Sequence, residues 1–215
     1  LILIWLMLTL WGFIIDIRGF SELLGILYYP VVPVSAIVLL LLASALVNAS
    51  RGLEAFGSVC YISLPFLIGG CIFLLFLMAK SAEVNRMFPL LGTGIIKIGK
   101  QTLGHAAVFN HLLSLMLFLP AFRNKGQFMK VTGWSSAIFA LLLAAIYWCY
   151  LIFFDGPLLS AISTPMHETT TYVGIGEYFT HIEIFFLFLL LFAIVLKFTF
   201  YVYISSLLFG TLFRI

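Results

Sequence analysis

Long uncharged apolar stretches dominate the hydrophobic pattern of this chain. Six of them approach or exceed the roughly 17 to 25 residues that a helix needs to cross about 30 Å of hydrocarbon. They cover residues 1–15, 31–48, 58–79, 106–122, 133–154 and 179–209. The first five contain no Asp, Glu, Lys or Arg, whereas the sixth contains Glu183 and Lys197. The pattern predicts an all-α multi-pass membrane protein, with six transmembrane helices in a single domain over residues 1–215.

The composition supports a membrane protein and excludes several other classes. Apolar residues make up 64% of the 215 positions and charged residues 9%, against about 25% charged in soluble domains. The net charge of +3 is too small for a nucleic-acid surface. Cys60, Cys71 and Cys149 lie in apolar stretches without metal-binding spacing. We therefore expect no enzymatic activity and no cofactor. Because the chain begins at Leu1 within an apolar stretch, we also expect it to be a piece of a longer protein.

The basic residues in the connections predict the orientation. The connections alternate between two sides of the membrane, and each side carries five basic residues. Those of the second side lie mostly in the short connections 49–57 and 123–132, which weigh most in the positive-inside rule. We place that side in the cytoplasm. Two long connections, 80–105 and 155–178, then lie outside. The first side carries Arg18, Lys80, Arg86, Lys97 and Lys100; the second carries Arg51, Arg123, Lys125, Lys130 and Arg214.

The two outer connections have different expected roles. Residues 80–105 can form an amphipathic helix in the interface, or a half-helix that breaks near Gly104 before the fourth span resumes around Phe109. Breaks of this kind expose backbone groups and bind substrate in many transporters. The connection 155–178 is rich in Pro, Gly and Thr and resembles an ordered outer loop that acts as a lid.

Glu183 is the most informative single residue, because a carboxylate inside a membrane helix costs at least about 2.5 kcal/mol unless it faces protein, water or a partner. Its functional interpretations are a ligand for an amino group, a cation site or a proton relay. The structural alternative is a helix-end carboxylate at the outer interface. His181 is expected to point elsewhere, so the partner of Glu183 is expected from another helix.

Lys197 follows Glu183 by 14 positions, which places it on nearly the same helix face but about 21 Å further along the axis. The two side chains are therefore too far apart to pair. Lys197, Tyr201 and Ser205 form an i, i+4, i+8 polar stripe. We interpret Lys197 as snorkelling to the inner headgroups.

Polar residues also surround the expected break. Gly104 and His105 precede Asn110 and His111, which either bind a ligand or hydrogen-bond to neighbouring helices. With Glu183 they form the predicted ligand-binding set. The four histidines, which include His167 and His181, lack a metal-binding spacing, and no metal site is expected.

Several glycines have expected structural roles. In the motif Arg51-Gly52-Leu53-Glu54, Gly52 permits a tight reversal and Arg51 anchors the cytoplasmic side. Gly69, Gly70 and Gly133 are interpreted as close-packing positions.

The order of four motifs resembles the B subunit of the spore germination receptors, the GerAB/GerKB type, over about residues 28–205. The motifs are Arg51-Gly52-Leu53-Glu54, Phe88-Pro89-Leu90-Leu91-Gly92-Thr93-Gly94-Ile95, Leu119-Pro120 and Ile175-Gly176-Glu177-Tyr178-Phe179-Thr180-His181-Ile182-Glu183. Lys197 matches a basic position common in that family. Two positions depart from it: His181-Ile182-Glu183 stands where the family has Arg-Leu-Glu, and Asn110-His111 where it often has Gly-Glu.

The resemblance implies a ten-helix LeuT-like inverted-repeat bundle in the amino acid, polyamine and organocation transporter superfamily. The six spans would be helices three to eight, helix six would be broken, and helices three, six and eight would line the ligand site. The implied function is sensing of a small nutrient, commonly an amino acid in that family, in the inner membrane of the bacterial endospore. The implied partners are the A and C subunits of the germinant receptor. An amino-acid permease and a structural subunit without a ligand remain as alternatives.

Overall fold

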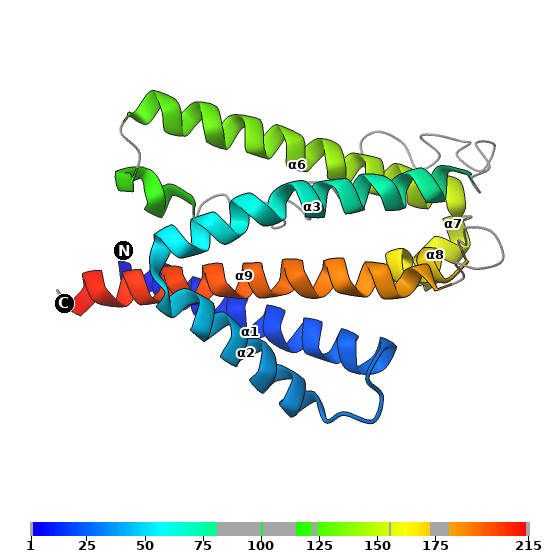
Figure 1. Cartoon of the computed structure of the whole chain (residues 1–215), viewed down its shortest axis with the longest axis horizontal. Coiled ribbons are helices and arrows are strands. Elements are labelled where there is room, and N and C mark those ends of the chain that lie inside the picture. Colours follow the sequence, from blue (N-terminus) through cyan, green and yellow to red (C-terminus); the bar gives the residue numbers. More distant parts are fainter. Residues whose placement is uncertain are drawn as a thin grey trace. The chain divides into compact units, whose positions relative to one another are not determined.

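The computed structural model describes residues 2–80, 100, 115–121, 124–154, 156–172 and 181–213, and all regular elements in this part of the chain are helices. They are α1 (Ile2–Leu27), α2 (Val34–Ser50), α3 (Gly52–Lys80), the 3-10 helix η3 (Met116–Ala121), α6 (Lys125–Phe153), α7 (Gly156–Ala161), α8 (Pro165–Tyr172) and α9 (Ile182–Phe213) (Figure 1). Of the expected fourth span, 106–122, the described part begins at residue 115.

Four helices, α1, α3, α6 and α9, are long and apolar enough to cross a membrane, and α2 is a shorter apolar helix. The most apolar part of α6 has no buried residue, and Trp134 and Leu141 on it are 72% and 70% exposed. Side chains of this kind are stable when they face lipid. The prediction of an all-α multi-pass membrane protein is confirmed for the described residues.

Helix α1 continues well past the expected end of the first span at residue 15. It ends at Leu27, so Asp16, Arg18 and Glu22 lie on a helix, and their predicted place in a connection is wrong. The expected boundary stopped at the first charged residue, but charge does not end a helix when the side chain finds a partner. Arg18 Nε donates to Glu22 Oε1 at 2.8 Å, an i, i+4 pair on the exposed side of α1.

The reversal between α2 and α3 takes place at Arg51 and Gly52. Gly52 has a φ of +85°, a left-handed conformation that other residues adopt only with strain. The predicted role of Gly52 is confirmed. The two helices are separated by Arg51 alone, so the expected connection 49–57 is almost entirely helical.

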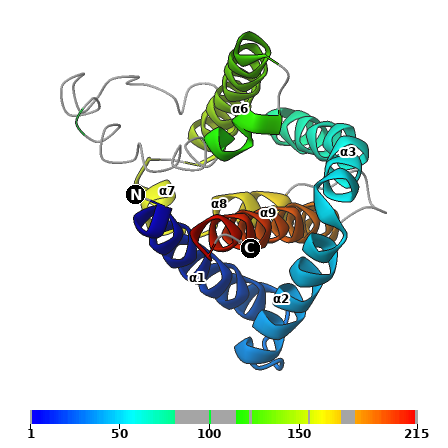
Figure 2. The same ribbon diagram turned by 90° about the vertical axis from the view of Figure 1, so that its left-hand side faces the viewer.

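The chain divides into two compact units, and the first consists of residues Leu1–Gly70 and Leu187–Ile215. Its core lies among α1, α2 and α9, which Figure 2 shows from one end. The core is built from aliphatic residues with two aromatic rings on α9: Ile17, Leu24, Ile37, Leu41, Ala45, Ile194, Phe198 and Tyr201. Each helix contributes a stripe, so the three helices depend on one another for burial.

The second unit consists of residues Cys71–Phe186. In it, α7 and α8 both contact α6, and the rings of Phe73 and Phe185 meet edge to face with centroids 5.8 Å apart. The connection 155–178, expected as a loop, contains the helices α7 and α8 in its described part. Its role as a lid stays a prediction.

The three glycines interpreted as close-packing positions differ in their surroundings. A Cβ at Gly70 would lie 2.6 and 2.7 Å from the two methyl carbons of Leu189, a side chain that is 5% exposed. At Gly69 and Gly133 no described atom lies within 4 Å of such a Cβ. The interpretation is confirmed for Gly70, and for Gly69 and Gly133 it stays a prediction, because no close neighbour is found among the described residues.

Gly70→Ala is expected to destabilise the chain by about 1 to 3 kcal/mol, because the new methyl group displaces the buried Leu189 side chain. Gly69→Ala is the matched control and should leave stability unchanged or raise it slightly, since alanine favours the helix. Thermal unfolding of the two variants in the same detergent makes the comparison. Equal unfolding temperatures for both variants would contradict the packing described here.

Candidate functional site

An ion pair joins α1 and α9 within their membrane-spanning segments. Lys197 Nζ lies 2.7 Å from Asp16 Oδ2, and the Tyr201 hydroxyl donates to the same oxygen at 2.9 Å. The side chains of Lys197 and Asp16 are 31% and 26% exposed. One carboxylate thus accepts from both an ammonium and a phenol, which is a charge-assisted arrangement.

Aromatic rings surround this ion pair. Lys197 Nζ lies 5.2 Å from the centre of the Phe20 ring, within the range of a cation–π interaction. The Phe13 ring lies 5.5 Å from the rings of both Tyr201 and Phe198. Phe13 and Phe20 stand three residues before and four residues after Asp16, so the three side chains share one face of α1. The rings place apolar surface next to the ion pair, where the attraction between charges is screened less than in bulk water.

The interpretation of Lys197 as a snorkelling residue is therefore wrong. A lysine near the middle of a long apolar helix can reach the headgroups or neutralise its charge locally, and here it has a carboxylate 2.7 Å away. The sequence reasoning missed Asp16 because it placed this residue in a connection. The sequence did contain a signal for Asp16. The uncharged stretch before it has only 15 residues, which is short for a complete span, so the helix should continue past Asp16.

The predicted polar stripe on α9 is only partly used. Lys197 and Tyr201 both contact Asp16, whereas Ser205 Oγ is buried without a hydrogen-bond partner among the described residues. Ser21 Oγ on α1 is in the same condition. These two hydroxyls are not part of the ion-pair cluster of Asp16, Lys197 and Tyr201.

A second polar group lies at the start of α9. His181 Nδ1 is 2.7 Å from Glu183 Oε1, so the expectation that His181 points elsewhere is wrong. The helical spacing rule does not apply, because His181 precedes the first helical residue, Ile182. The Glu183 side chain is 20% exposed, and its Oε2 is buried without a hydrogen-bond partner among the described residues. Among the described residues, one oxygen of Glu183 therefore has no hydrogen-bond donor.

The other predicted ligand-binding residues, Gly104, His105, Asn110 and His111, lie outside the described residues. The same holds for most of the connection 80–105 and its expected half-helix. Their association with Glu183 stays a prediction. Within the part of the chain that the structure describes, no group of three His, Cys, Asp or Glu side chains is close enough to hold a metal ion.

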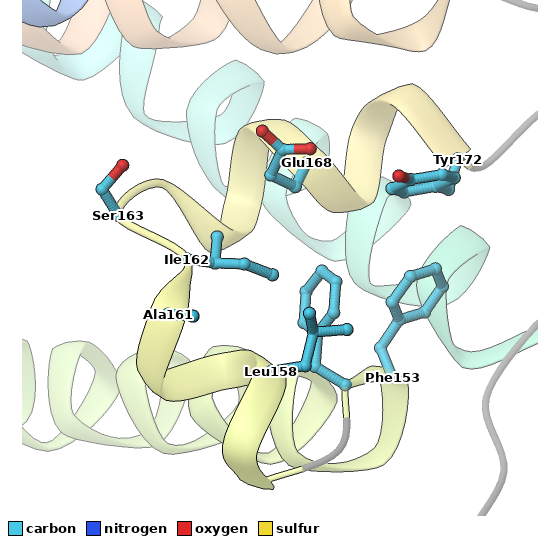
Figure 3. A pocket seen from close by; sticks show the side chains of 8 residues that line it. Phe153, Leu158, Ala161, Ile162, Ser163, Glu168 and Tyr172 are labelled. Carbon is cyan, nitrogen blue, oxygen red and sulfur yellow. The ribbon is translucent and has the colours of Figure 1, made fainter.

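A cleft of about 680 Å³ opens where α6 ends, between the α6–α7 corner and α8 (Figure 3). Sequence reasoning did not identify it as a site, although it marked the connection 155–178 as unusual. Most of its lining is apolar or aromatic, with Glu168 as the charged member: Phe153, Phe154, Leu158, Ala161, Ile162, Ser163, Glu168 and Tyr172.

Long apolar helices, and a charge pair between two of them, define a multi-pass membrane protein with polar groups inside its spans. The family is given by comparison with known proteins. The family model described as spore germination protein matches residues 1–215, and the chain belongs to this family. The resemblance found in the sequence is thereby confirmed. No curated protein and no solved structure matches the chain significantly. The ten-helix inverted-repeat arrangement stays a prediction.

Asp16→Asn is expected to destabilise the chain by about 2 to 3 kcal/mol, because it leaves the Lys197 ammonium unpaired in a membrane-spanning segment. The double variant Asp16→Asn, Lys197→Gln should recover most of this loss, because it removes both charges. Thermal unfolding in lipid nanodiscs measures both effects.

Glu22→Gln provides the control for this experiment, since it removes a carboxylate from an exposed pair on the same helix. Its expected effect is below about 1 kcal/mol. If Asp16→Asn proves as mild as Glu22→Gln, or if the double variant is no more stable than Asp16→Asn, the ion pair does not hold α1 against α9.

Proposed function

We propose that this chain is the membrane subunit of a nutrient germinant receptor, which senses a small nutrient such as an amino acid and triggers spore germination. In this proposal it works with the receptor's A and C subunits in the inner membrane of the bacterial endospore. Membership of the spore germination protein family supports a germination role.

The observation that carries the proposal is the ion-pair cluster of Asp16, Lys197 and Tyr201. A membrane subunit that serves only as a scaffold needs no charge within its spans, and apolar residues would pack there at lower cost. Charged groups inside a membrane bundle commonly mark ligand sites, ion paths or switching contacts. An ion pair suits a switch, because it can be made in one helix arrangement and broken in another.

The nutrient binds, in this proposal, at the expected helix break around Gly104, His105, Asn110 and His111, with Glu183 as the acidic member of the site. The buried Oε2 of Glu183 supports this role, because it is an acceptor without a described partner. An ammonium group such as that of an amino acid satisfies such an oxygen with a charge-assisted hydrogen bond.

Helix α9 connects this site to the ion pair. Glu183 lies in its first turn and Lys197 about 21 Å further along the same helix, so a small rotation or shift of α9 acts on both. A ligand that binds one of two helix packings more tightly would then shift the protein toward that packing. The size of the shift depends on the ratio of the ligand's affinities for the two packings.

An amino-acid permease that works by alternating access is the second candidate. The Asp16–Lys197 pair favours it as well, because transporters also place paired charges within their spans. A structural subunit without a ligand is the third. The three candidates differ in what happens to a nutrient and in whether germination depends on Glu183.

Spores that carry Glu183→Gln in the full-length protein should need about tenfold more nutrient for a half-maximal germination rate, because one charge-assisted contact is lost. Adding Asn110→Ala and His111→Ala should abolish the response. The rate is read from the fall in optical density after nutrient addition, with protein levels checked by immunoblot. Glu54→Gln, at an exposed carboxylate of α3, is the control.

Two outcomes would contradict the receptor proposal. A normal response in spores with the triple variant, at unchanged protein level, would favour a structural subunit. Accumulation of a labelled amino acid in vesicles that contain the full-length protein would favour the permease.

A further inference from the structure

The cleft beside α8 has the dimensions of a small-molecule site. Its volume of about 680 Å³ lies within the range of about 300 to 1,000 Å³ that is common for ligand pockets. All eight of its lining residues lie within one unit of the chain, between Phe153 and Tyr172. None of them belongs to the proposed nutrient site, so the cleft calls for an explanation of its own.

The cleft is lined mainly by apolar and aromatic residues, together with the polar Ser163 and Glu168. The lining residues follow the end of the membrane-spanning α6 at Phe153 and include Tyr172 on α8, a helix with the polar sequence PMHETTTY. Leu158 and Tyr172 are 51% and 72% exposed, whereas Phe154 is 3% exposed. Apolar surface that is left open in this way becomes more stable when an apolar group covers it.

Phe153, Phe154 and Tyr172 are the aromatic members of the lining. The rings of Phe153 and Phe154 meet nearly edge to face with centroids 5.0 Å apart. The Tyr172 ring lies on α8, on the other side of the cleft from α6 (Figure 3). The faces of such rings carry partial negative charge and attract an ammonium group.

Glu168 gives the cleft its charge. It lies on α8 and is half-buried, and no ion pair or side-chain hydrogen bond engages its carboxylate within the described residues. The neighbouring hydroxyls of Thr169, Thr170 and Thr171 all donate to backbone carbonyls of the same segment at 2.7 Å. These hydroxyls therefore donate to backbone groups and not to the Glu168 carboxylate, which has no partner among the described residues.

We propose that this cleft binds a small soluble amine, a primary ammonium attached to an apolar or aromatic group. The ammonium pairs with the Glu168 carboxylate and lies over the Tyr172 ring, and the apolar group covers Leu158 and Ile162. The ligand enters from the aqueous side, which the distribution of basic residues predicts to be the outer side. This site is independent of nutrient sensing, because it uses none of the residues assigned to that function.

The test uses the full-length protein in phosphatidylglycerol nanodiscs, a lipid without an ammonium group, with phenethylammonium chloride as the probe. Ligand-observed NMR titration should show saturable binding of phenethylammonium and binding of neutral 2-phenylethanol at least about fivefold weaker. Glu168→Gln should weaken phenethylammonium binding by about the same factor and leave 2-phenylethanol unaffected. Tyr172→Ala should weaken both ligands.

Glu54→Gln is the matched control, because it removes an exposed carboxylate far from Glu168 in the sequence and should bind phenethylammonium normally. Equal affinity for the amine and the alcohol, or wild-type affinity in Glu168→Gln, would overturn the proposal. Loss of amine binding in nanodiscs that contain phosphatidylethanolamine would overturn it too, since the occupant would then be a lipid headgroup. Germination assays do not enter this test, so its result stands apart from the proposed function.

Discussion

The ion pair between Asp16 and Lys197 sets the arrangement of α1 against α9. Neither charge is stable alone in a membrane-spanning segment, and together they form a contact of 2.7 Å. The pair also fixes the register of the two helices, because the Tyr201 hydroxyl, one turn beyond Lys197, reaches the same oxygen. Phe13 and Phe20, on the same face of α1 as Asp16, can then pack on the aromatic side chains of α9. Packing against lipid alone would leave this register undetermined, since apolar helices slide past one another at little cost.

Two sets of charged groups among the described residues have different roles: the paired Asp16 and Lys197, and the open acceptors Glu183 Oε2 and Glu168. Those within the spans are satisfied, since Asp16 and Lys197 neutralise each other. Those at the ends of helices keep acceptors that no described residue fills, namely Glu183 Oε2 and the carboxylate of Glu168. Satisfied charges stabilise a helix arrangement, whereas open acceptors give a ligand something to bind. A protein that converts binding into a change of helix packing needs both kinds.

The sequence was sufficient for the helical membrane architecture, because the length of an uncharged apolar stretch is a direct physical requirement for crossing a bilayer. The tight reversal at Gly52 could also be predicted, since only glycine adopts its φ without strain. The Asp16–Lys197 pair could not, because nothing local tells which residue of a distant helix faces Lys197. The contact of His181 with Glu183 was missed because a helical spacing rule was applied to a residue that precedes the helix. Gly69 and Gly70 are alike in sequence context, and only the position of Leu189 tells them apart.

The most direct test of the ion pair as the organising contact is a charge exchange. Asp16→Lys and Lys197→Asp are made singly and together in the full-length protein, and accumulation in membranes and unfolding temperature are measured. Each single reversal is expected to lower both quantities strongly, because two like charges then face each other. The exchanged pair is expected to recover most of the loss. Stable single reversals, or an exchanged pair no better than the singles, would contradict it.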